Sequence, residues 1–130
     1  MTDDRDLDTV LAAYRAFAGG DIAAAVADLD ADVVWVEPDS FVNGGRHDGR
    51  AAVAAYLQAS HASWRELTSD PRARRVGDRV VVEHHLSGVL ADGTPATALA
   101  VDVFTLRGGV VVHMQAYADP SDLPDALVER

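Results

Sequence analysis

The chain has 130 residues, a length typical of one domain, and its 11 basic and 21 acidic residues give a net charge of −10 at pH 7. It contains no cysteine, and every basic residue is an arginine. Thiol nucleophiles, disulfides, thiolate metal sites and lysine Schiff bases are therefore excluded. The acidic balance argues against nucleic acid and anionic membranes as partners, because both require clustered positive charge.

The first residues of the chain are acidic and lack the basic and apolar regions of a signal peptide. No apolar run approaches the ~20 residues that span a bilayer. A hydrophobic fraction of 48% with 25% charged residues is typical of a globular protein. The sequence therefore predicts a cytoplasmic protein that forms a single domain over residues 1–130.

Apolar residues spaced by three and four predict an amphipathic helix over residues 4–18. Gly19-Gly20 follows it, and glycine commonly ends a helix because it accepts the left-handed conformation. Asp21 can then cap a second helix over residues 22–29, since its carboxylate accepts the free N–H groups of the first turn.

Residues 32–37 are rich in β-branched and aromatic side chains and predict a strand that places Trp35 and Glu37 on one face. The glycine-rich segment 39–48 reads as a loop. A third helix is expected over residues 50–59.

From residue 64 onward the apolar pattern alternates, which predicts extended strands. Asp-Gly and Gly-Gly pairs between the segments are typical of hairpin turns, so the strands should form an antiparallel meander. A short helix is expected after Asp119-Pro120-Ser121. Helices followed by a meander predict the α+β class, with the helices on one face of a curved sheet. The expected strands cover residues 65–75, 79–90, 94–106 and 110–118.

Several segments together resemble the nuclear transport factor 2-like (NTF2-like) superfamily, and within it the SnoaL-like and ketosteroid isomerase branch. The resemblance covers nearly the whole chain. The segments that carry it are Gly20-Asp21-Ile22, the strand that ends at Glu37-Pro38, Asp48-Gly49-Arg50 and Val110 to Tyr117.

This resemblance implies a cone-shaped fold, in which a strongly bent antiparallel sheet wraps around the N-terminal helices and leaves a deep apolar pocket. Such a pocket implies a small apolar or cyclic substrate and no cofactor, and many members of the superfamily are homodimers through the outer sheet face. Isomerases, cyclases, epoxide hydrolases, dehydratases and binding domains share the fold, so the reaction depends on the residues of the site.

Two carboxylates are the strongest catalytic candidates. Glu37 falls where ketosteroid isomerases carry the aspartate of an Asp-Pro pair as general base, and burial would raise its pKa. Asp102 lies within an apolar strand, where an unpaired charge is costly. The resemblance implies that Asp102 stays protonated and donates a hydrogen bond to an enolate. The alternatives are an exposed Glu37 and an Asp102 that points outward or pairs with arginine or histidine.

Tyr14 and His85 are further candidates. The resemblance implies a tyrosine on the first helix as second oxyanion donor, although a buried core tyrosine fits Tyr14 equally well. An ungapped match through the Asp92-Gly93 turn places His85 in the pocket, where it could carry a proton. The apolar pattern of the same strand instead favours an inward His84, together with Val80, Val82 and Leu86.

The remaining candidates are wall residues and structural groups. Asp119 reads as the N-cap of the terminal helix more readily than as an acid in the site. His47 and Asp48 are too few to predict a metal site, so no metal is expected. The residues expected to line a substrate pocket are Trp35, Tyr56, Phe104 and Met114.

Three functions remain open from the sequence. The first is a cofactor-independent isomerase that uses Glu37 as base and Asp102, with Tyr14 or His85, to stabilise an enolate. The second is a polyketide cyclase or epoxide hydrolase, although epoxide hydrolases of this fold use an Asp-Arg-Asp set that has no match beside Asp102. The third is a binding domain without catalysis. Convergence of Glu37 and Asp102 on one cavity would favour an enzyme.

Overall fold

Three α-helices and six strands form the part of the chain that the computed structural model describes, residues 4–128. Two short 3₁₀ turns follow the last strand. The elements are α1 (Arg5–Ala18), α2 (Ile22–Ala25), β1 (Leu29–Glu37), β2 (Gly45–Asp48), α3 (Arg50–Ala62), β3 (Trp64–Val76), β4 (Arg79–Leu90), β5 (Pro95–Arg107), β6 (Val110–Tyr117), η1 (Pro120–Asp122) and η2 (Asp125–Leu127).

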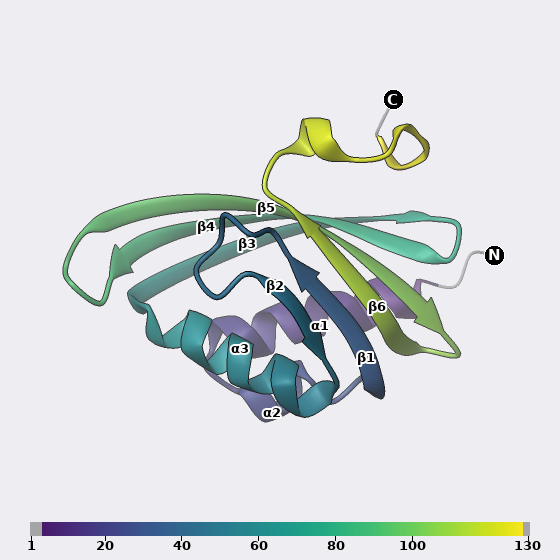
Figure 1. Ribbon diagram of the computed structural model, residues 1–130, viewed down its shortest axis with the longest axis horizontal. Coiled ribbons are helices and arrows are strands. Elements are labelled where there is room, and N and C mark those ends of the chain that lie inside the picture. Colours follow the sequence, from purple (N-terminus) through teal and green to yellow (C-terminus); the bar gives the residue numbers. More distant parts are fainter. Residues whose placement is uncertain (1–3, 129–130) are drawn as a thin grey trace.

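The strands form one curved sheet in the order β2-β1-β6-β5-β4-β3. Strands β3 to β6 form the expected antiparallel meander, and β1 joins it through a parallel pair with β6. All three helices lie on one side of the sheet and the C-terminal segment lies on the other (Figure 1). This arrangement is the predicted α+β architecture. The sheet is mixed, because β6, which is distant from β1 in the sequence, runs parallel beside it.

Helix α1 forms as predicted and directs its apolar stripe, which includes Val10, Tyr14 and Phe17, toward the sheet. Gly20 follows it with a φ of 80°, and the Asp21 carboxylate caps α2 by accepting from the Ala24 N–H at 3.1 Å. The expectation that this second helix continues to residue 29 is wrong. It ends at residue 25, because Leu29 already pairs with Val111 of β6 as the first residue of β1.

Strand β2 lies within the segment 39–48, which the sequence predicts as a loop. Its four residues pair with the end of β1, so that Trp35 lies opposite His47 and Glu37 opposite Gly45. Glycine, arginine, histidine and aspartate are weak strand formers, and the pairing with β1 forms this strand despite them.

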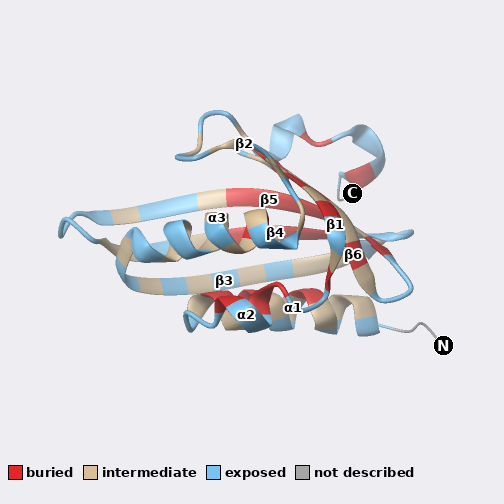
Figure 2. Ribbon diagram, turned by 60° about the horizontal axis from the view of Figure 1, so that its bottom comes forward, coloured by how far each residue is buried: buried red, intermediate tan, exposed pale blue. Residues whose placement is uncertain are grey.

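The middle of β5, residues 100–104, is buried on both faces and forms the red stretch of this strand in Figure 2. Alternate residues face the helices, while Val101 and Val103 pack against Leu123 and Leu127 of the C-terminal segment. That segment contains 3₁₀ turns where the sequence predicts a short helix. Asp119 caps the first turn through the Ser121 N–H at 2.9 Å, which confirms the N-cap prediction.

The β4–β5 hairpin projects beyond the helices at one end of the molecule (Figure 1). Near its base β3 carries a bulge between Trp64 and Glu66, and Gly88 of β4, with a φ of 147°, pairs with Leu67 beside the bulge. A Cβ atom at Gly88 would lie 2.0 Å from the backbone oxygen of Glu66. The close approach of β3 and β4 at this bend therefore requires glycine.

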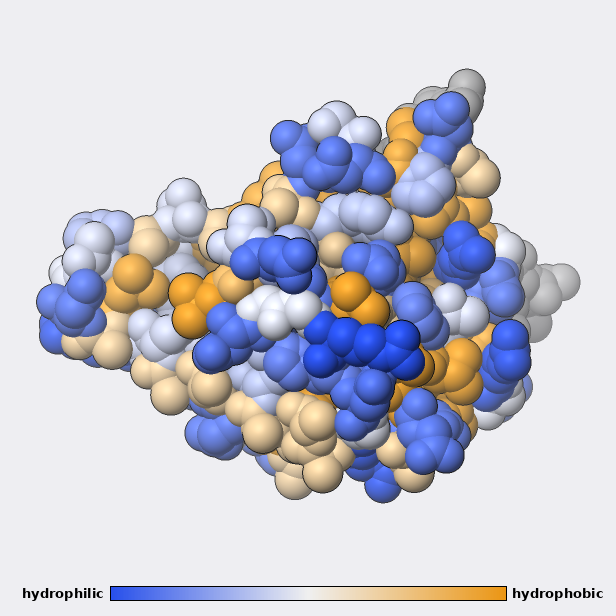
Figure 3. Space-filling view, in the orientation of Figure 1, coloured by the Kyte–Doolittle hydropathy of each residue, from blue (hydrophilic) through white to orange (hydrophobic). Residues whose placement is uncertain are grey.

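The face seen in Figure 3 is largely hydrophilic, and its hydrophobic residues lie in separate patches. Within residues 4–128, none of the helices has the length and apolar character needed to cross a membrane.

Replacement of Gly88 by alanine should lower the free energy of unfolding by at least about 2 kcal/mol, because backbone strain and overlap with the Glu66 carbonyl add. Urea denaturation followed by circular dichroism measures the change. Gly77→Ala is the matched control, since Gly77 has a φ of 63° but a Cβ atom there would meet no other atom within 4 Å, and it should cost only about 1 kcal/mol. Equal losses for the two variants would contradict this account of the bend.

Candidate active site

A cavity of about 600 Å³ lies between the helices and the inner face of the sheet. Most of its lining is apolar or aromatic, contributed by α1, α3 and strands β1, β4 and β5. The charged residues on its wall are all acidic, namely Asp28, Glu37, Asp92 and Asp102; no arginine lines it within residues 4–128. A cavity of this size and character fits a small, largely apolar molecule.

Glu37 is the last residue of β1 and lies on the cavity wall with only 7% of its surface exposed. Alternation along the strand places it on the same face as Trp35, whose indole Nε1–H donates to Glu37 Oε1 at 2.9 Å. The Tyr56 hydroxyl of α3 is the second donor beside this carboxylate and, like Trp35, lowers its pKa. Glu37 is therefore buried and oriented by two donors, and the alternative of an exposed strand-end glutamate is wrong.

Asp102 lies in the middle of β5 and points into the same cavity with 8% exposure. Alternation along β5 puts Ala98, Ala100 and Phe104 on the same cavity-lining face as Asp102. The Tyr14 hydroxyl donates a hydrogen bond to Asp102 Oδ2. Tyr14 thus lies on the cavity wall beside the second carboxylate.

Glu37 and Asp102 affect each other's environment. Burial raises the pKa of Glu37 above the ordinary glutamate value, and the negative charge of Asp102 raises it further. The hydrogen bonds from Trp35 and Tyr56 act in the opposite direction. Burial also raises the pKa of Asp102, against the hydrogen bond from Tyr14. Two acids that both resist ionisation in one cavity tend to share a single negative charge near neutral pH.

The two tyrosines remain protonated donors. Burial raises the pKa of Tyr14, and the charges of Asp102 and Glu37 raise it further. Burial and the charge of Glu37 likewise raise the pKa of Tyr56. Both hydroxyl groups therefore keep their protons at any physiological pH and stabilise negative charge in the cavity.

His84, not His85, faces the cavity. His84 has 6% exposure, its Nε2 lies 2.7 Å from Ser69 Oγ, and its ring meets the Tyr14 ring edge-on with centroids 4.6 Å apart. Burial, and to a smaller extent the neighbouring His85, lowers the pKa of His84 to about 4. His84 is therefore neutral at pH 7. The expectation that His85 lies in the pocket is wrong.

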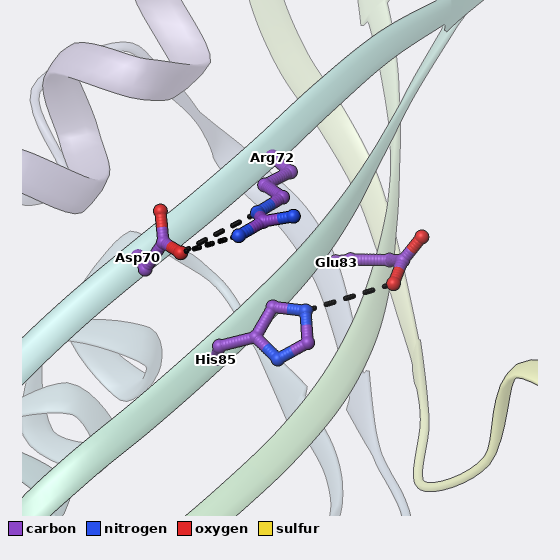
Figure 4. A network of polar contacts seen from close by, with 4 residues as sticks. All are labelled: Asp70, Arg72, Glu83 and His85. Carbon is purple, nitrogen blue, oxygen red and sulfur yellow. Dashed lines mark hydrogen bonds and ion pairs between the residues drawn. The ribbon is translucent and has the colours of Figure 1, made fainter.

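His85 points to the outer face of the sheet, where its Nε2 lies 3.6 Å from Glu83 Oε1 (Figure 4). The neighbouring pair Asp70 and Arg72 on β3 belongs to the same exposed polar network. The physical reason is the apolar stripe of β4, Val80, Val82 and Leu86, which places residue 84 inward by alternation. The apolar stripe therefore predicts the inward histidine correctly, whereas the ungapped alignment through the Asp92-Gly93 turn predicts the wrong one.

Of the four expected wall residues, Trp35, Tyr56 and Phe104 line the cavity. Met114 does not, because it is fully buried in the core behind that wall. It pairs with Trp35 on one side and Phe104 on the other, and these two cavity-lining rings meet edge-on with centroids 5.9 Å apart.

The hydrogen bonds from Trp35 and Tyr56 to Glu37 were not foreseen. The shared strand face of Trp35 and Glu37 was visible in the sequence, whereas the approach of Tyr56 depends on how α3 packs. Within residues 4–128, no group of three or more histidine, cysteine, aspartate or glutamate side chains is arranged to hold a metal ion.

Comparison with known proteins identifies the family. The family model of the SnoaL-like domain matches residues 10–114, and the chain therefore belongs to the SnoaL-like domain family. None of the curated proteins matches it.

Similar solved structures share the fold over most of the chain. An NTF2-like protein of unknown function from Burkholderia pseudomallei is 27% identical over 92% of each chain, with a TM-score of 0.78. A putative polyketide cyclase from Xanthomonas campestris is 29% identical over 92% of this chain and 93% of that chain, with a TM-score of 0.72. TerC, co-crystallised with polyporic acid, is 28% identical over 90% of this chain and 93% of its own, with a TM-score of 0.75.

The raised pKa of Glu37 makes a prediction about stability. The folded state holds this proton at pH values where an unfolded glutamate has lost it, so the group's contribution to stability falls as pH rises through that interval. Glu37→Gln removes the titration. Its free energy of unfolding, relative to that of the unmodified protein, should therefore be higher at pH 9 than at pH 5, by about 1.4 kcal/mol for each unit by which the pKa is raised.

Urea denaturation of both proteins at several pH values tests this, and the difference between them cancels the contribution of groups that do not interact with Glu37. A difference that stays constant between pH 5 and pH 9 would mean that Glu37 titrates like an exposed glutamate.

Proposed function

We propose that this protein is a cofactor-independent acid–base enzyme that moves a proton on a small, apolar, cyclic ketone, as ketosteroid isomerases do. The observation that carries the proposal is the convergence of Glu37 and Asp102 on one apolar cavity, each with a raised pKa and with tyrosine donors beside them. A group that exchanges protons with carbon works best when its pKa lies near the working pH.

In the proposed reaction the Glu37 carboxylate removes a proton from the carbon next to the substrate carbonyl. The C–H electron pair forms a new carbon–carbon double bond, and the carbonyl electrons move onto oxygen to give an enolate. A hydrogen bond from protonated Asp102 stabilises this oxygen. The Tyr14 hydroxyl donates its one hydrogen to Asp102 Oδ2 before substrate binds, so it must turn from Asp102 to the substrate oxygen to act as the second donor. Glu37 then returns the proton to a carbon further along the conjugated system, so that a double bond has moved and no other reactant is consumed.

The distribution of hydrogen bonds supports these two roles. Glu37 accepts from two donors, Trp35 and Tyr56, which favour its charged form as base. Asp102 accepts only from Tyr14 among the described residues. Burial and the charge of Asp102 raise the pKa of Glu37 further than burial raises that of Asp102, which favours the proton on Glu37 before substrate binds. The mechanism requires that substrate binding moves the negative charge to Glu37 and the proton to Asp102.

The cavity wall also limits the substrate. Its charged side chains are all acidic, so an anionic substrate would be repelled, and a neutral one is favoured. The wall is otherwise rich in aromatic rings, which suit a flat ring system. TerC, a protein of similar fold, was co-crystallised with the small molecule polyporic acid.

The other two hypotheses fit less well. An epoxide hydrolase of the Asp-Arg-Asp type needs an arginine in the cavity, and none lines it within residues 4–128. A binding domain without catalysis has no need of two buried acids. In such a domain the carboxylates would be expected to pair with arginine or to face solvent. Glu37 and Asp102 are instead buried and accept hydrogen bonds from Trp35 and Tyr14, respectively.

Polyketide cyclisation is the second candidate, favoured by the 29% identity to a putative polyketide cyclase. Ring closure by an aldol reaction also begins with removal of a proton next to a carbonyl, so Glu37 and Asp102 would keep their roles. The product distinguishes the two, because a cyclase forms a carbon–carbon bond in an open-chain poly-ketone ester. A homodimer, which the family resemblance implies, remains a prediction.

Turnover of β,γ-unsaturated cyclic ketones, including steroid ketones, tests the proposal by the ultraviolet absorbance of the conjugated product. Glu37→Gln should lower kcat about 100-fold or more, because the base is lost. Asp102→Asn should lower it by a similar factor, because oxyanion stabilisation is weakened. kcat/KM should rise with pH through the raised pKa of Glu37, well above the ordinary glutamate range.

His85→Ala is the matched control, since His85 lies on the outer face, and its activity should equal that of the unmodified protein. No turnover of any ketone in the panel, or turnover that both carboxylate variants retain, would overturn the isomerase proposal.

A further inference from the structure

His47 lies one strand away from the proposed base and points toward the same side of the sheet as the groups that hold it. It sits in β2 directly opposite Trp35 in β1. Directly paired residues of antiparallel strands project from the same face, and Trp35 is buried on the cavity side. The His47 side chain is therefore directed toward α3, which lies on that side.

The imidazole of His47 packs against Tyr56 of α3. The two ring centroids are 4.7 Å apart, and the ring planes are inclined by 40°. Tyr56 is the residue whose hydroxyl donates to Glu37. His47 thus supports the aromatic ring of one donor to the base and is the cross-strand neighbour of the other donor, Trp35.

A hydrogen bond fixes the orientation of the His47 ring. Its Nε2 lies 2.9 Å from the backbone oxygen of Asn43. A carbonyl oxygen only accepts, so Nε2 carries the hydrogen. Asn43 has a φ of 59° and lies on the cavity wall. The bond therefore ties the ring to the segment between β1 and β2, and the ring has little freedom to turn away from Tyr56.

We propose that His47 is a positioning residue that holds the Tyr56 hydroxyl on the Glu37 carboxylate. His47 is not among the residues that line the cavity, so it acts on the base only through Tyr56. The contribution of His47 to catalysis rests on the proposed function, whereas its effect on the pKa of Glu37 does not. His47, which together with Asp48 offers too few ligands for a metal site, thereby has a role in the proposed site.

The test is a titration of Glu37 that needs no substrate. The chain contains four glutamates, so carbon-13 labelling of glutamate side chains gives few carboxyl signals in an NMR spectrum, and Glu37→Gln identifies the one of interest. The hydrogen bond from Tyr56 lowers the pKa of Glu37. Tyr56→Phe should therefore raise its titration midpoint, by roughly one pH unit for a bond to a charged group.

His47→Leu should raise the midpoint in the same direction, by about half as much, because the Tyr56 hydroxyl is no longer held in place. The double variant His47→Leu/Tyr56→Phe should show no shift beyond that of Tyr56→Phe alone, since His47 acts through Tyr56. His85→Leu, a histidine change on the outer face, should leave the midpoint unchanged.

An unchanged midpoint in His47→Leu, or additive shifts in the double variant, would overturn the proposal. Circular dichroism checks that each variant is folded. If His47→Leu is not folded, His47→Gln replaces it, because its amide can still donate to the Asn43 carbonyl while the ring is lost, and the same upward shift is expected. Shifts as predicted in a protein that turns over no ketone would refute the isomerase and leave the positioning role standing.

Discussion

The burial of two carboxyl groups beside one apolar cavity is the constraint on which the rest of the structure depends. An isolated charge in such a place costs several kcal/mol, and two like charges cost more. The chain meets this cost with donors from three elements: Tyr14 from α1 for Asp102, and Trp35 from β1 and Tyr56 from α3 for Glu37. The pair still ionises with difficulty, which leaves a proton available for chemistry.

The fold serves this arrangement by curving a sheet over the helices. The β2-β1 pair brings Glu37 to the end of a strand beside the cavity, while the meander carries Asp102 on the central strand β5. Since the C-terminal segment covers the other face of β5, this strand is held on both sides and Asp102 has little freedom to turn outward. His84 adds a polar group that stays neutral, so it does not supply the charge that would favour ionisation of the acids.

Local patterns in the sequence predict much of this site, and tertiary packing decides the rest. Alternation places Asp102 and Phe104 inward because a strand has a period of two residues, whatever its neighbours. The same rule, applied to the apolar stripe of β4, gives His84 correctly; the assumed alignment gave His85. Burial of Met114 follows from an apolar strand, but its separation from the cavity depends on the meeting of two rings from other strands. The strand β2 and the parallel β1-β6 pair depend on contacts between distant segments, which short windows of sequence do not contain.

The coupling of Glu37 and Asp102 is the central claim, and titration of Glu37 in Asp102→Asn measures it most directly. The negative charge of Asp102 raises the pKa of Glu37, so its removal should lower the carbon-13 titration midpoint of the Glu37 carboxyl while burial keeps that midpoint above the ordinary glutamate value. A midpoint that does not move, or one that already lies at the value of an exposed glutamate in the unmodified protein, would contradict a shared proton between the two acids.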